Sequence, residues 1–339
     1  MYQQFAEELK KAVSASSVLI DEPMNRHTTF RIGGPADVFC MPESEEELRA
    51  AVLLCRDNDI PFYILGNGSN LLVADEGYRG VIIQLYKNFA QITIEPAAEK
   101  SIDRKSPDAE PTDSENEMAS STHVIAPPIH MIITAQAGAM LSAVSRRAAE
   151  ASLTGLEFAS GIPGTIGGAM VMNAGAYGGE MKQVTKSVRA MRVDGTFLDI
   201  PAEEMAFGYR TSRAQSEGLI ILGCRMELQK GDLEKIKGRM EELRQQRTSK
   251  QPLDMPSAGS TFKRPTGYFA GKLIMDAGLR GYRVGDAMVS EKHCGFVVNA
   301  GSATAAQIRQ LMKDVQKKVY EQFGVTLERE VKLLGFEEK

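Results

Sequence analysis

Tryptophan is absent from this chain of 339 residues, and cysteine and histidine are scarce, with four residues of each. The cysteines are far apart and form no C-x-x-C pair, which argues against a disulfide framework and against a zinc site; they are Cys40, Cys55, Cys224 and Cys294. The histidines show no metal-ligand spacing either. We therefore expect free thiols in a reducing compartment and no metal centre.

The chain also lacks a long apolar run and an excess of positive charge. No segment approaches the apolar length that a helix needs to cross a bilayer. The first 13 residues, MYQQFAEELKKAV, contain acidic residues and no apolar stretch of the secretory type. A formal net charge of −4 gives no electrostatic reason to expect a nucleic-acid partner. These absences predict a cytoplasmic protein with neither a membrane nor a nucleic acid as partner.

Glycine, in contrast, is concentrated in one stretch. Residues 154–179, TGLEFASGIPGTIGGAMVMNAGAYGG, contain eight glycines. Glycine reaches positive φ without a Cβ penalty and lets a ligand approach the backbone closely, and free N–H groups in such loops suit phosphate oxygens. We interpret this stretch as the floor of a cofactor site. A set of tight turns without a ligand is the alternative from composition alone.

A second glycine-rich loop, GNGSN at residues 66–70, follows a short apolar strand at residues 62–65. A strand that leads into such a loop is typical of a dinucleotide-binding fingerprint. However, Leu71 stands where that fingerprint needs its third glycine, and no helical pattern follows. A Rossmann fold is therefore rejected here, although the loop still offers N–H, amide and hydroxyl groups to a pyrophosphate.

Apolar periodicity and turn signals predict the helices and strands. Helices are expected over residues 4–13, after Ser44, and over 140–151, 232–250, 268–277 and 304–323. Ser44 begins a capping box, and the apolar positions of its helix are Leu48, Ala51, Val52 and Cys55. Strands are expected over residues 28–32, 62–65, 81–85, 130–138, 187–193, 196–200, 219–228, 296–299 and 325–334.

Two of these strand predictions carry further detail. Asp194-Gly195 predicts a hairpin between the strands that flank it. In the last strand, alternation puts Leu327, Arg329 and Val331 on one face, and Glu328, Glu330 and Lys332 on the other.

A chain of 339 residues is long for one hydrophobic core and indicates two or three domains, with one boundary near the charged helix at 232–250. Residues 95–123 differ from their surroundings, because they contain eight Asp or Glu, three Lys or Arg, three Pro and no aromatic residue. Such a composition cannot bury enough apolar surface to order itself. We expect a flexible insertion between two strands.

Seven short motifs span nearly the whole chain. They are LGNGSNLLVA at 65–74, SGIPGTIGGA at 160–169, NAGAYG at 173–178, Y-R-x-S at 209–212, AGSTFKRP at 258–265, EKHCGFVVN at 291–299 and LEREV at 327–331. Together and in this order they resemble the UDP-N-acetylenolpyruvoylglucosamine reductase family, the flavoenzymes that complete UDP-N-acetylmuramate in bacterial wall synthesis.

The resemblance implies an α+β fold of three parts. Residues 1–86 and 87–230 would form a two-part FAD-binding unit of the vanillyl-alcohol oxidase type, with the insertion 95–123 in the second part. Residues 231–339 would form a C-terminal α+β substrate-binding domain. The chain resembles the shorter branch of the family, which lacks a loop that folds over the substrate. The implied protein is a monomer that acts on a small molecule.

The implied activity is the NADPH-dependent reduction of UDP-N-acetylglucosamine enolpyruvate, with non-covalently bound FAD as the hydride carrier. By motif position, Arg210 resembles the cation that holds the substrate carboxylate, a role that suits an always charged, bidentate guanidinium. Ser260 resembles the general acid that protonates the enol carbon, and Glu330 the third catalytic member. A serine hydroxyl is a weak acid, so Ser260 needs a charged neighbour, which could be Lys263 or Arg210.

The resemblance also implies the binding residues. The FAD-binding residues are expected to be Gly66, Asn67, Gly68, Ser69, Asn70, Gly161, Ile162, Pro163, Gly164, Thr165, Gly167, Gly168, Asn173, Ala174, Gly175, Ala176 and Tyr177. The expected substrate-binding residues are Tyr209, Arg210, Lys263, Arg264 and His293, of which Tyr209, Lys263 and Arg264 are candidates for the diphosphate. His293 and Cys294 are adjacent, and in a strand they would point to opposite faces, so packing or substrate contact is expected rather than a base–thiol pair.

Two other hypotheses stay open. A flavin oxidase of the same fold, acting on an alcohol or a sugar, often attaches FAD through His or Cys near these loops, and residues 66–70 and 161–177 contain neither. A non-catalytic nucleotide-binding protein is the third hypothesis, and the presence of Arg210, Ser260 and Glu330 argues against it. Without the resemblance, each of these three residues would be interpreted as an ordinary surface or turn residue.

Overall fold

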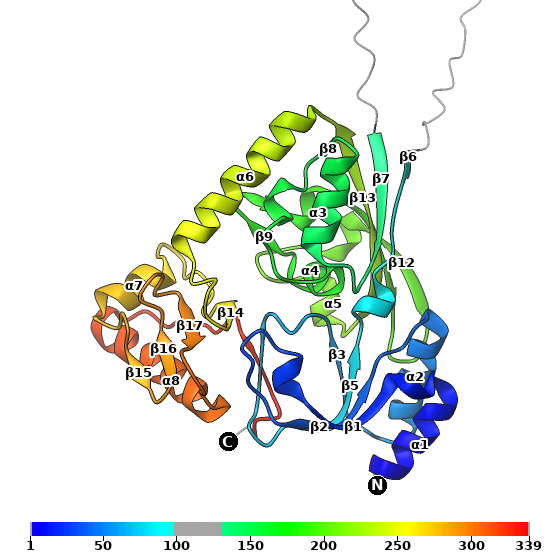
Figure 1. Ribbon diagram of the computed structural model, residues 1–339, viewed down its shortest axis with the longest axis horizontal. Helices are drawn as coiled ribbons and strands as arrows, with labels where there is room; N and C mark the ends of the chain where they lie inside the picture. Colours follow the sequence, from blue (N-terminus) through cyan, green and yellow to red (C-terminus); the bar gives the residue numbers. More distant parts are fainter. Residues whose placement is uncertain (1, 98–129, 338–339) are drawn as a thin grey trace, which may run out of the picture.

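A computed structural model describes residues 2–97 and 130–337 of the chain (Figure 1). Residues 98–123 of the predicted acidic insertion lie outside the described residues. The described part contains three sheets of four or more strands, one from each third of the chain, and two short strand pairs. None of the helices in this part is both long enough and apolar enough to cross a membrane.

The N-terminal sheet has the strand order β1-β2-β5-β3. Its elements are α1 (Tyr2–Ala12), β1 (Val18–Pro23), β2 (Pro35–Cys40), α2 (Glu45–Asp57), β3 (Phe62–Leu65) and β5 (Tyr78–Gln84). The predicted start of α2 is confirmed, because the Ser44 hydroxyl accepts a hydrogen bond from the Glu47 N–H at 3.1 Å. The four apolar positions predicted for α2 are the four that it buries. The sheet therefore packs its helices on one shared core, with α1 and α2 beside each other.

The middle sheet has the order β12-β11-β13-β7-β6, and all its neighbouring strands are antiparallel. The strands are β6 (Ile92–Pro96), β7 (His130–Gln136), β11 (Thr185–Met191), β12 (Phe197–Pro201) and β13 (Ile220–Lys230), with the short β8 (Leu153–Thr154) paired to β13. The predicted hairpin at Asp194-Gly195 is confirmed by the pairing of β11 with β12. Helices α3 (Leu141–Glu150), α4 (Ile166–Met172) and α5 (Arg213–Ser216) lie on one side of this sheet (Figure 1).

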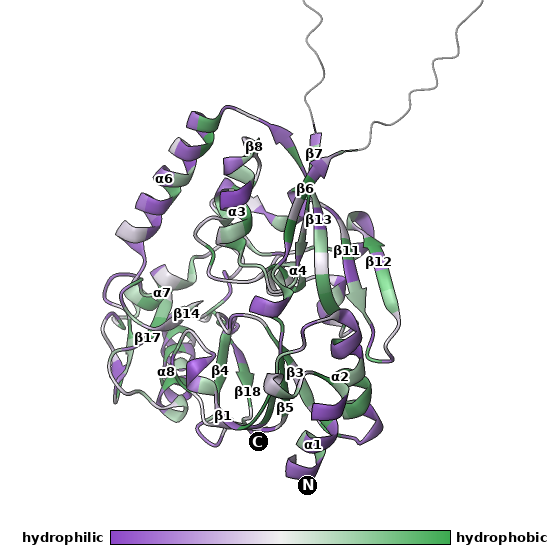
Figure 2. Cartoon of the chain, turned by 45° about the vertical axis from the view of Figure 1, so that its right-hand side comes forward, coloured by the Kyte–Doolittle hydropathy of each residue, from purple (hydrophilic) through white to green (hydrophobic). Residues whose placement is uncertain are grey.

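The C-terminal part begins with α6 (Leu233–Lys250), which buries only Ile236 and Leu243 and is largely hydrophilic in Figure 2. The following sheet has the order β14-β17-β16-β15, made by β14 (Ser257–Ser260), β15 (Arg283–Val284), β16 (Ala287–Val289) and β17 (Phe296–Asn299). Helices α7 (Ala270–Asp276) and α8 (Ala305–Phe323) pack against it. Both were predicted, and a full capping box at Thr304 begins α8 while Gly324, at φ +66°, ends it.

Two strand predictions are wrong. Residues 28–32 form a turn, because the Thr28 hydroxyl donates to the Ile32 carbonyl at 2.9 Å and closes the segment on itself, with Arg31 at φ +56°. In the C-terminal segment, only β18 (Lys332–Leu334) is a strand. Leu327 and Val331 are both buried, whereas Arg329, which was predicted to share their face, is exposed, since a guanidinium is costly to bury without a carboxylate.

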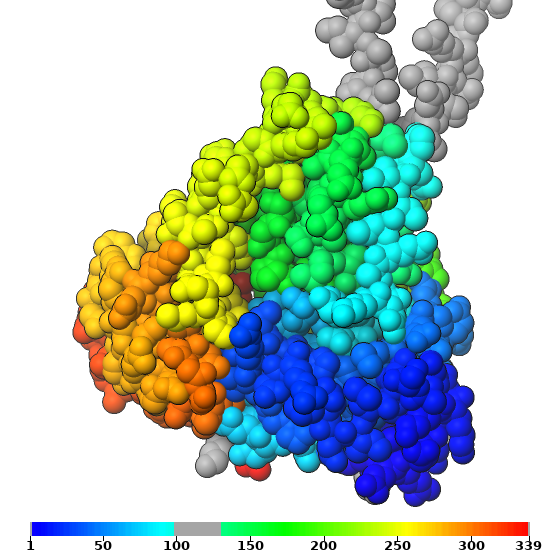
Figure 3. Space-filling model, viewed as in Figure 1, coloured from blue at the N-terminus to red at the C-terminus, as the bar shows by residue number. Residues whose placement is uncertain are grey.

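The C-terminal part rests on the N-terminal part. Strand β18 pairs in parallel with β4 (Leu71–Val73), and Phe30, Ile32 and Leu72 belong to the same core cluster as α8. The Asp75 carboxylate accepts hydrogen bonds from the Ala305 and Ala306 N–H groups at 2.7 and 2.9 Å and so caps α8 from another part of the chain. In Figure 3 the yellow and orange C-terminal part lies against both the blue and the green parts.

Candidate active site

The two glycine-rich loops lie side by side, as a shared cofactor site requires. The loop at 66–70 joins β3 to β4, and its Asn67 side-chain amide donates a hydrogen bond to the Pro163 carbonyl of the second loop at 2.7 Å. A Cβ at Gly66 would lie 2.4 Å from the Thr165 hydroxyl, and Gly68 has φ +60° with the His27 carbonyl 2.0 Å from its missing Cβ. Glycine is therefore required for the loops to approach each other this closely.

The second loop leads into α4, whose first turn contains Gly167 and Gly168. A Cβ at Gly168 would meet nothing within 4 Å, so this backbone faces open space, as does Gly178. Gly164 is similarly uncrowded, with the Ser69 hydroxyl 3.7 Å from its missing Cβ. Bare backbone and hydroxyl groups on one surface fit the diphosphate and ribityl parts of an FAD, which need N–H and O–H donors rather than bulky side chains.

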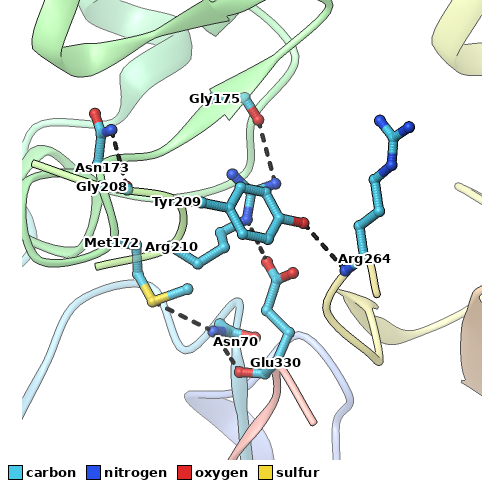
Figure 4. Close-up of polar contacts among 9 residues, drawn as sticks. All are labelled: Asn70, Met172, Asn173, Gly175, Gly208, Tyr209, Arg210, Arg264 and Glu330. Carbon is cyan, nitrogen blue, oxygen red and sulfur yellow. Dashed lines mark hydrogen bonds and ion pairs between the residues drawn. The ribbon is translucent and has the colours of Figure 1, made fainter. Parts of the chain in front are cut away.

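Asn173 ends α4 in the left-handed conformation, with φ +43°, and is buried. Its side-chain amide donates to the Glu180 carboxylate at 2.8 Å and to the Gly208 carbonyl at 3.1 Å, and its oxygen accepts from the Lys182 N–H at 3.0 Å. Figure 4 shows this bond to Gly208, just before the loop of Tyr209 and Arg210. The Asn173 side chain is thus occupied by the protein and holds that loop in place.

Arg210 and Glu330 face each other across the site (Figure 4). The Arg210 Nε donates to Glu330 Oε1 at 2.8 Å, and Nη2 donates to the Gly175 carbonyl at 3.4 Å. Arg210 has φ +57°, an unusual conformation for a long side chain. Burial raises the pKa of Glu330, while the positive charges of Arg210 and Lys263 act in the opposite direction. The pair is consequently a mostly buried ion pair between two distant parts of the chain.

Ser260 completes the trio of predicted catalytic residues. It lies at the end of β14, opposite Phe296 in β17, and lines the same cavity of about 400 Å³ as Arg210 and Glu330. Its hydroxyl is exposed to that cavity and, within the described parts of the chain, has no hydrogen-bond partner. A free hydroxyl that shares a cavity with a guanidinium can donate to a ligand that enters it.

The predicted substrate-binding residues divide into two groups. Tyr209 and Arg264 line the cavity, and the Arg264 N–H donates to the Tyr209 hydroxyl at 3.2 Å (Figure 4). The Arg264 guanidinium lies 4.0 Å from the centre of the Phe269 ring. Lys263 does not line this cavity and forms an ion pair with Glu328. Lys263 is therefore poorly placed for the diphosphate unless that pair opens.

Three further cations line the cavity and were not identified from the sequence: Lys272, Arg280 and Lys292. They come from α7 and from the turns before and after β15 and β16. Each resembles an ordinary surface cation in sequence, and only the fold brings them together. With Arg264 they give the cavity a positive lining that suits a diphosphate.

His293 also lines the cavity, but the assumption that it lies in a strand was wrong. His293 and Cys294 lie in a turn before β17, not in a strand, and both border the cavity. The His293 Nδ1 accepts a hydrogen bond from the Gly295 N–H at 3.1 Å. Burial lowers the pKa of His293 and raises the pKa of Cys294. A neutral imidazole and a protonated thiol favour contact with a ligand over base–thiol chemistry.

Comparisons with known proteins agree along the chain. Residues 251–334 match the family model for the C-terminal domain of UDP-N-acetylenolpyruvoylglucosamine reductase, and residues 36–102 and 121–201 match an FAD-binding domain. The UDP-N-acetylenolpyruvoylglucosamine reductase of Agathobacter rectalis is 49% identical over 99% of both chains. That of Clostridioides difficile is 46% identical over 96% of both chains.

A solved structure gives the same result for the fold. The crystal structure of UDP-N-acetylenolpyruvylglucosamine reductase from Thermus caldophilus is 34% identical, with a TM-score of 0.70 over 94% of this chain and 98% of that chain. The predicted α+β fold with an FAD-binding unit and a C-terminal domain is confirmed. On this sequence identity over nearly its full length, the chain belongs to the UDP-N-acetylenolpyruvoylglucosamine reductase family.

Proposed function

We propose that this protein reduces UDP-N-acetylglucosamine enolpyruvate to UDP-N-acetylmuramate, with FAD as bound cofactor and NADPH as reductant. The observation that carries the proposal is the meeting of Arg210, Ser260 and Glu330 in one cavity, because the three come from separate motifs far apart in sequence. Membership of the reductase family supports the reaction, and the FAD-binding domain supports the cofactor.

In this proposal, FAD binds to the two glycine-rich loops. The residues proposed to hold it are Gly66–Asn70, Gly161–Thr165, Gly167, Gly168 and Asn173–Tyr177, most of them through backbone groups. When bound, the flavin supplies the hydride that the enolpyruvyl group accepts at its CH₂ terminus. The Asn173 side chain acts indirectly, since its hydrogen bonds join this segment to the loop of Arg210.

Arg210 holds the substrate carboxylate, on which negative charge builds when the CH₂ terminus is reduced. Glu330 accepts a hydrogen bond from the Nε of Arg210 and so holds the guanidinium in one orientation. The guanidinium is therefore oriented before the substrate binds. Ser260 donates the proton that the neighbouring carbon needs. Of the two cations considered as its activator, Arg210 shares the cavity with Ser260, whereas Lys263 is engaged with Glu328.

The uridine diphosphate is proposed to bind beside the cations that line the cavity. Arg264, Lys272, Arg280 and Lys292 supply positive charge, and Tyr209 and His293 supply polar contacts. The three-part division at residues 86 and 230 is supported by the three sheets, although β18 of the last part pairs with β4 of the first. We further propose a monomer in the cytoplasm, where its nucleotide-linked substrate would be available.

The test is an anaerobic absorption experiment on the purified protein. A flavin band that bleaches with NADPH and returns when UDP-N-acetylglucosamine enolpyruvate is added would establish the reductase. A bound flavin that stays reduced until oxygen or another acceptor is admitted would favour an oxidase of the same fold. A protein that binds no FAD would contradict the placement of the cofactor.

A further inference from the structure

A second cavity, of about 940 Å³, lies between α3, α6 and the glycine-rich stretch. Its walls are mainly apolar, with Phe158, Leu233 and Leu243 among them. Gly161, Pro163 and Tyr177, all from the segment proposed to hold FAD, form the side that faces the cofactor loops. Helix α6 therefore presents its side chains to the same segment, and three of them are cations: Lys237, Arg244 and Arg247.

Lys237 and Arg244 form ion pairs with Glu234 and Glu241, whereas Arg247, in the last turn of α6, forms none that the structure describes. Its side chain is half-buried, and among residues 2–97 and 130–337 no hydrogen-bond or ion-pair partner for its guanidinium is found. Burial accordingly lowers the pKa of Arg247. By contrast, the pKa of Arg244, which lines the same cavity, is raised by hydrogen bonds to Glu241. A partly buried guanidinium without an anion is costly, and a bound anion would offset that cost.

The glycine-rich loop makes room for this side chain. A Cβ at Gly161 would lie 2.9 Å from the Arg247 Cδ, so the arginine passes directly over the glycine backbone. Gly161 has no unusual backbone conformation that would itself require glycine. The three atoms nearest to such a Cβ, beyond the adjacent residues, all belong to Arg247, so a larger residue here requires the arginine to shift.

Two independent connections place Arg247 near the catalytic cavity. On one side, the Gly175 carbonyl accepts from Arg210, and Tyr177, two residues later, borders the cavity of Arg247. On the other side, Lys292 of the catalytic cavity donates to the carbonyl of Thr248, the residue after Arg247, at 2.6 Å. The reacting end of the cofactor must lie where the substrate meets Arg210. The connection through Gly175 and Tyr177 brings Arg247 toward that end, whereas Lys292 is among the cations proposed for the diphosphate.

We propose that Arg247 stabilises the negative charge of the flavin ring in its reduced state. A hydride from NADPH brings two electrons and one proton to the ring, which leaves the ring anionic until the hydride passes to the substrate. A cation nearby lowers the energy of the anionic form and so raises the reduction potential. The inference rests on the proposed placement of FAD on the glycine-rich stretch.

The test measures the midpoint potential of bound FAD, with a reference dye under anaerobic conditions, in the wild type and in Arg247→Met. We expect the dissociation constant of reduced FAD to rise at least tenfold relative to that of oxidised FAD, which makes the potential about 30 mV more negative. Arg247→Lys keeps the charge and should restore most of the wild-type potential. Arg244→Met, in the same cavity but paired with Glu241, is the matched control and should leave the potential unchanged.

Other outcomes overturn the inference. If Arg247→Met loses affinity for oxidised and reduced FAD equally, Arg247 binds the FAD diphosphate or supports the loop and does not stabilise the reduced ring. An unchanged potential with a raised KM for NADPH or substrate would make it a phosphate ligand. If Arg247→Met retains no FAD, Gly161→Ala is measured instead, because its Cβ displaces the arginine, and a wild-type potential there contradicts the role. Absence of FAD from the wild type would refute the proposed function itself, a result distinct from FAD bound at an unaltered potential.

Discussion

Glu330 accepts a hydrogen bond from the Nε of Arg210 at 2.8 Å, although 120 positions of sequence separate them. Both side chains are mostly buried, with 23% of Arg210 and 13% of Glu330 exposed. Glu330 lies in the segment that runs from α8 to β18, the strand that pairs with β4. The pair therefore forms only when the C-terminal part has docked on the middle part, which carries Arg210, while β18 holds the segment to the first part.

Replacing Glu330 with Gln should lower kcat by about 100-fold, because Arg210 loses the charge that orients it and small displacements of a catalytic group are costly. The measurement is steady-state turnover of the enolpyruvyl substrate with NADPH. Glu328→Gln is the matched control, since the Glu328 side chain is 70% exposed and its ion pair with Lys263 should contribute little. Equal effects of the two substitutions would contradict the role of Glu330.

The same carboxyl predicts a pH dependence of stability. Because burial raises the pKa of Glu330, folding favours its protonated form. Its favourable contribution is complete below the unfolded pKa of about 4.3 and is lost as pH rises through the higher folded pKa. Glu330→Gln, which is neutral at every pH, leaves Arg210 without its carboxylate at every pH. Its melting temperature should therefore compare more favourably with that of the wild type at pH 8 than near pH 4. A difference in melting temperature that is constant from pH 4 to pH 8 would show that the charge of Glu330 is not responsible.

The sequence predicted most helices and strands, because their apolar patterns and caps are local; α2, with its Ser44 cap and buried face, is an example. It failed at residues 28–32, where a side-chain hydrogen bond of Thr28 outweighs β propensity. Arg210, Ser260 and Glu330 could be named through motifs. The other cations could not be identified from the sequence, because their significance depends on a shared cavity or on the absence of a nearby carboxylate, and a sequence pattern shows neither. They are Lys272, Arg280, Lys292 and Arg247.

Replacing Ser260 with Ala should separate the two half-reactions. Reduction of the flavin by NADPH should proceed at the wild-type rate, whereas reoxidation by the enolpyruvyl substrate should slow by about 10²- to 10⁴-fold, the usual contribution of a proton donor. Stopped-flow absorption measures each step separately. Ser257→Ala, in the same strand but outside the catalytic cavity, should leave both steps unchanged. Normal reoxidation in Ser260→Ala would remove this residue as the proton donor.

Replacing Asp75 with Ala should loosen the docking on which the Arg210–Glu330 pair depends. Its carboxylate caps the first turn of α8 through two hydrogen bonds, and loss of a cap costs about 0.5–2 kcal/mol. Asp75 follows β4, and its cap holds α8 and the rest of the C-terminal part in place. The substitution should therefore also raise KM for the enolpyruvyl substrate, because most of the residues that line its cavity belong to the C-terminal part. Denaturant unfolding and steady-state kinetics measure the two effects.

Glu321→Ala, near the other end of α8 in a long exposed ion pair with Lys317, is the control and should change neither. A lower stability with an unchanged KM would mean that the cap stabilises α8 without positioning Glu330.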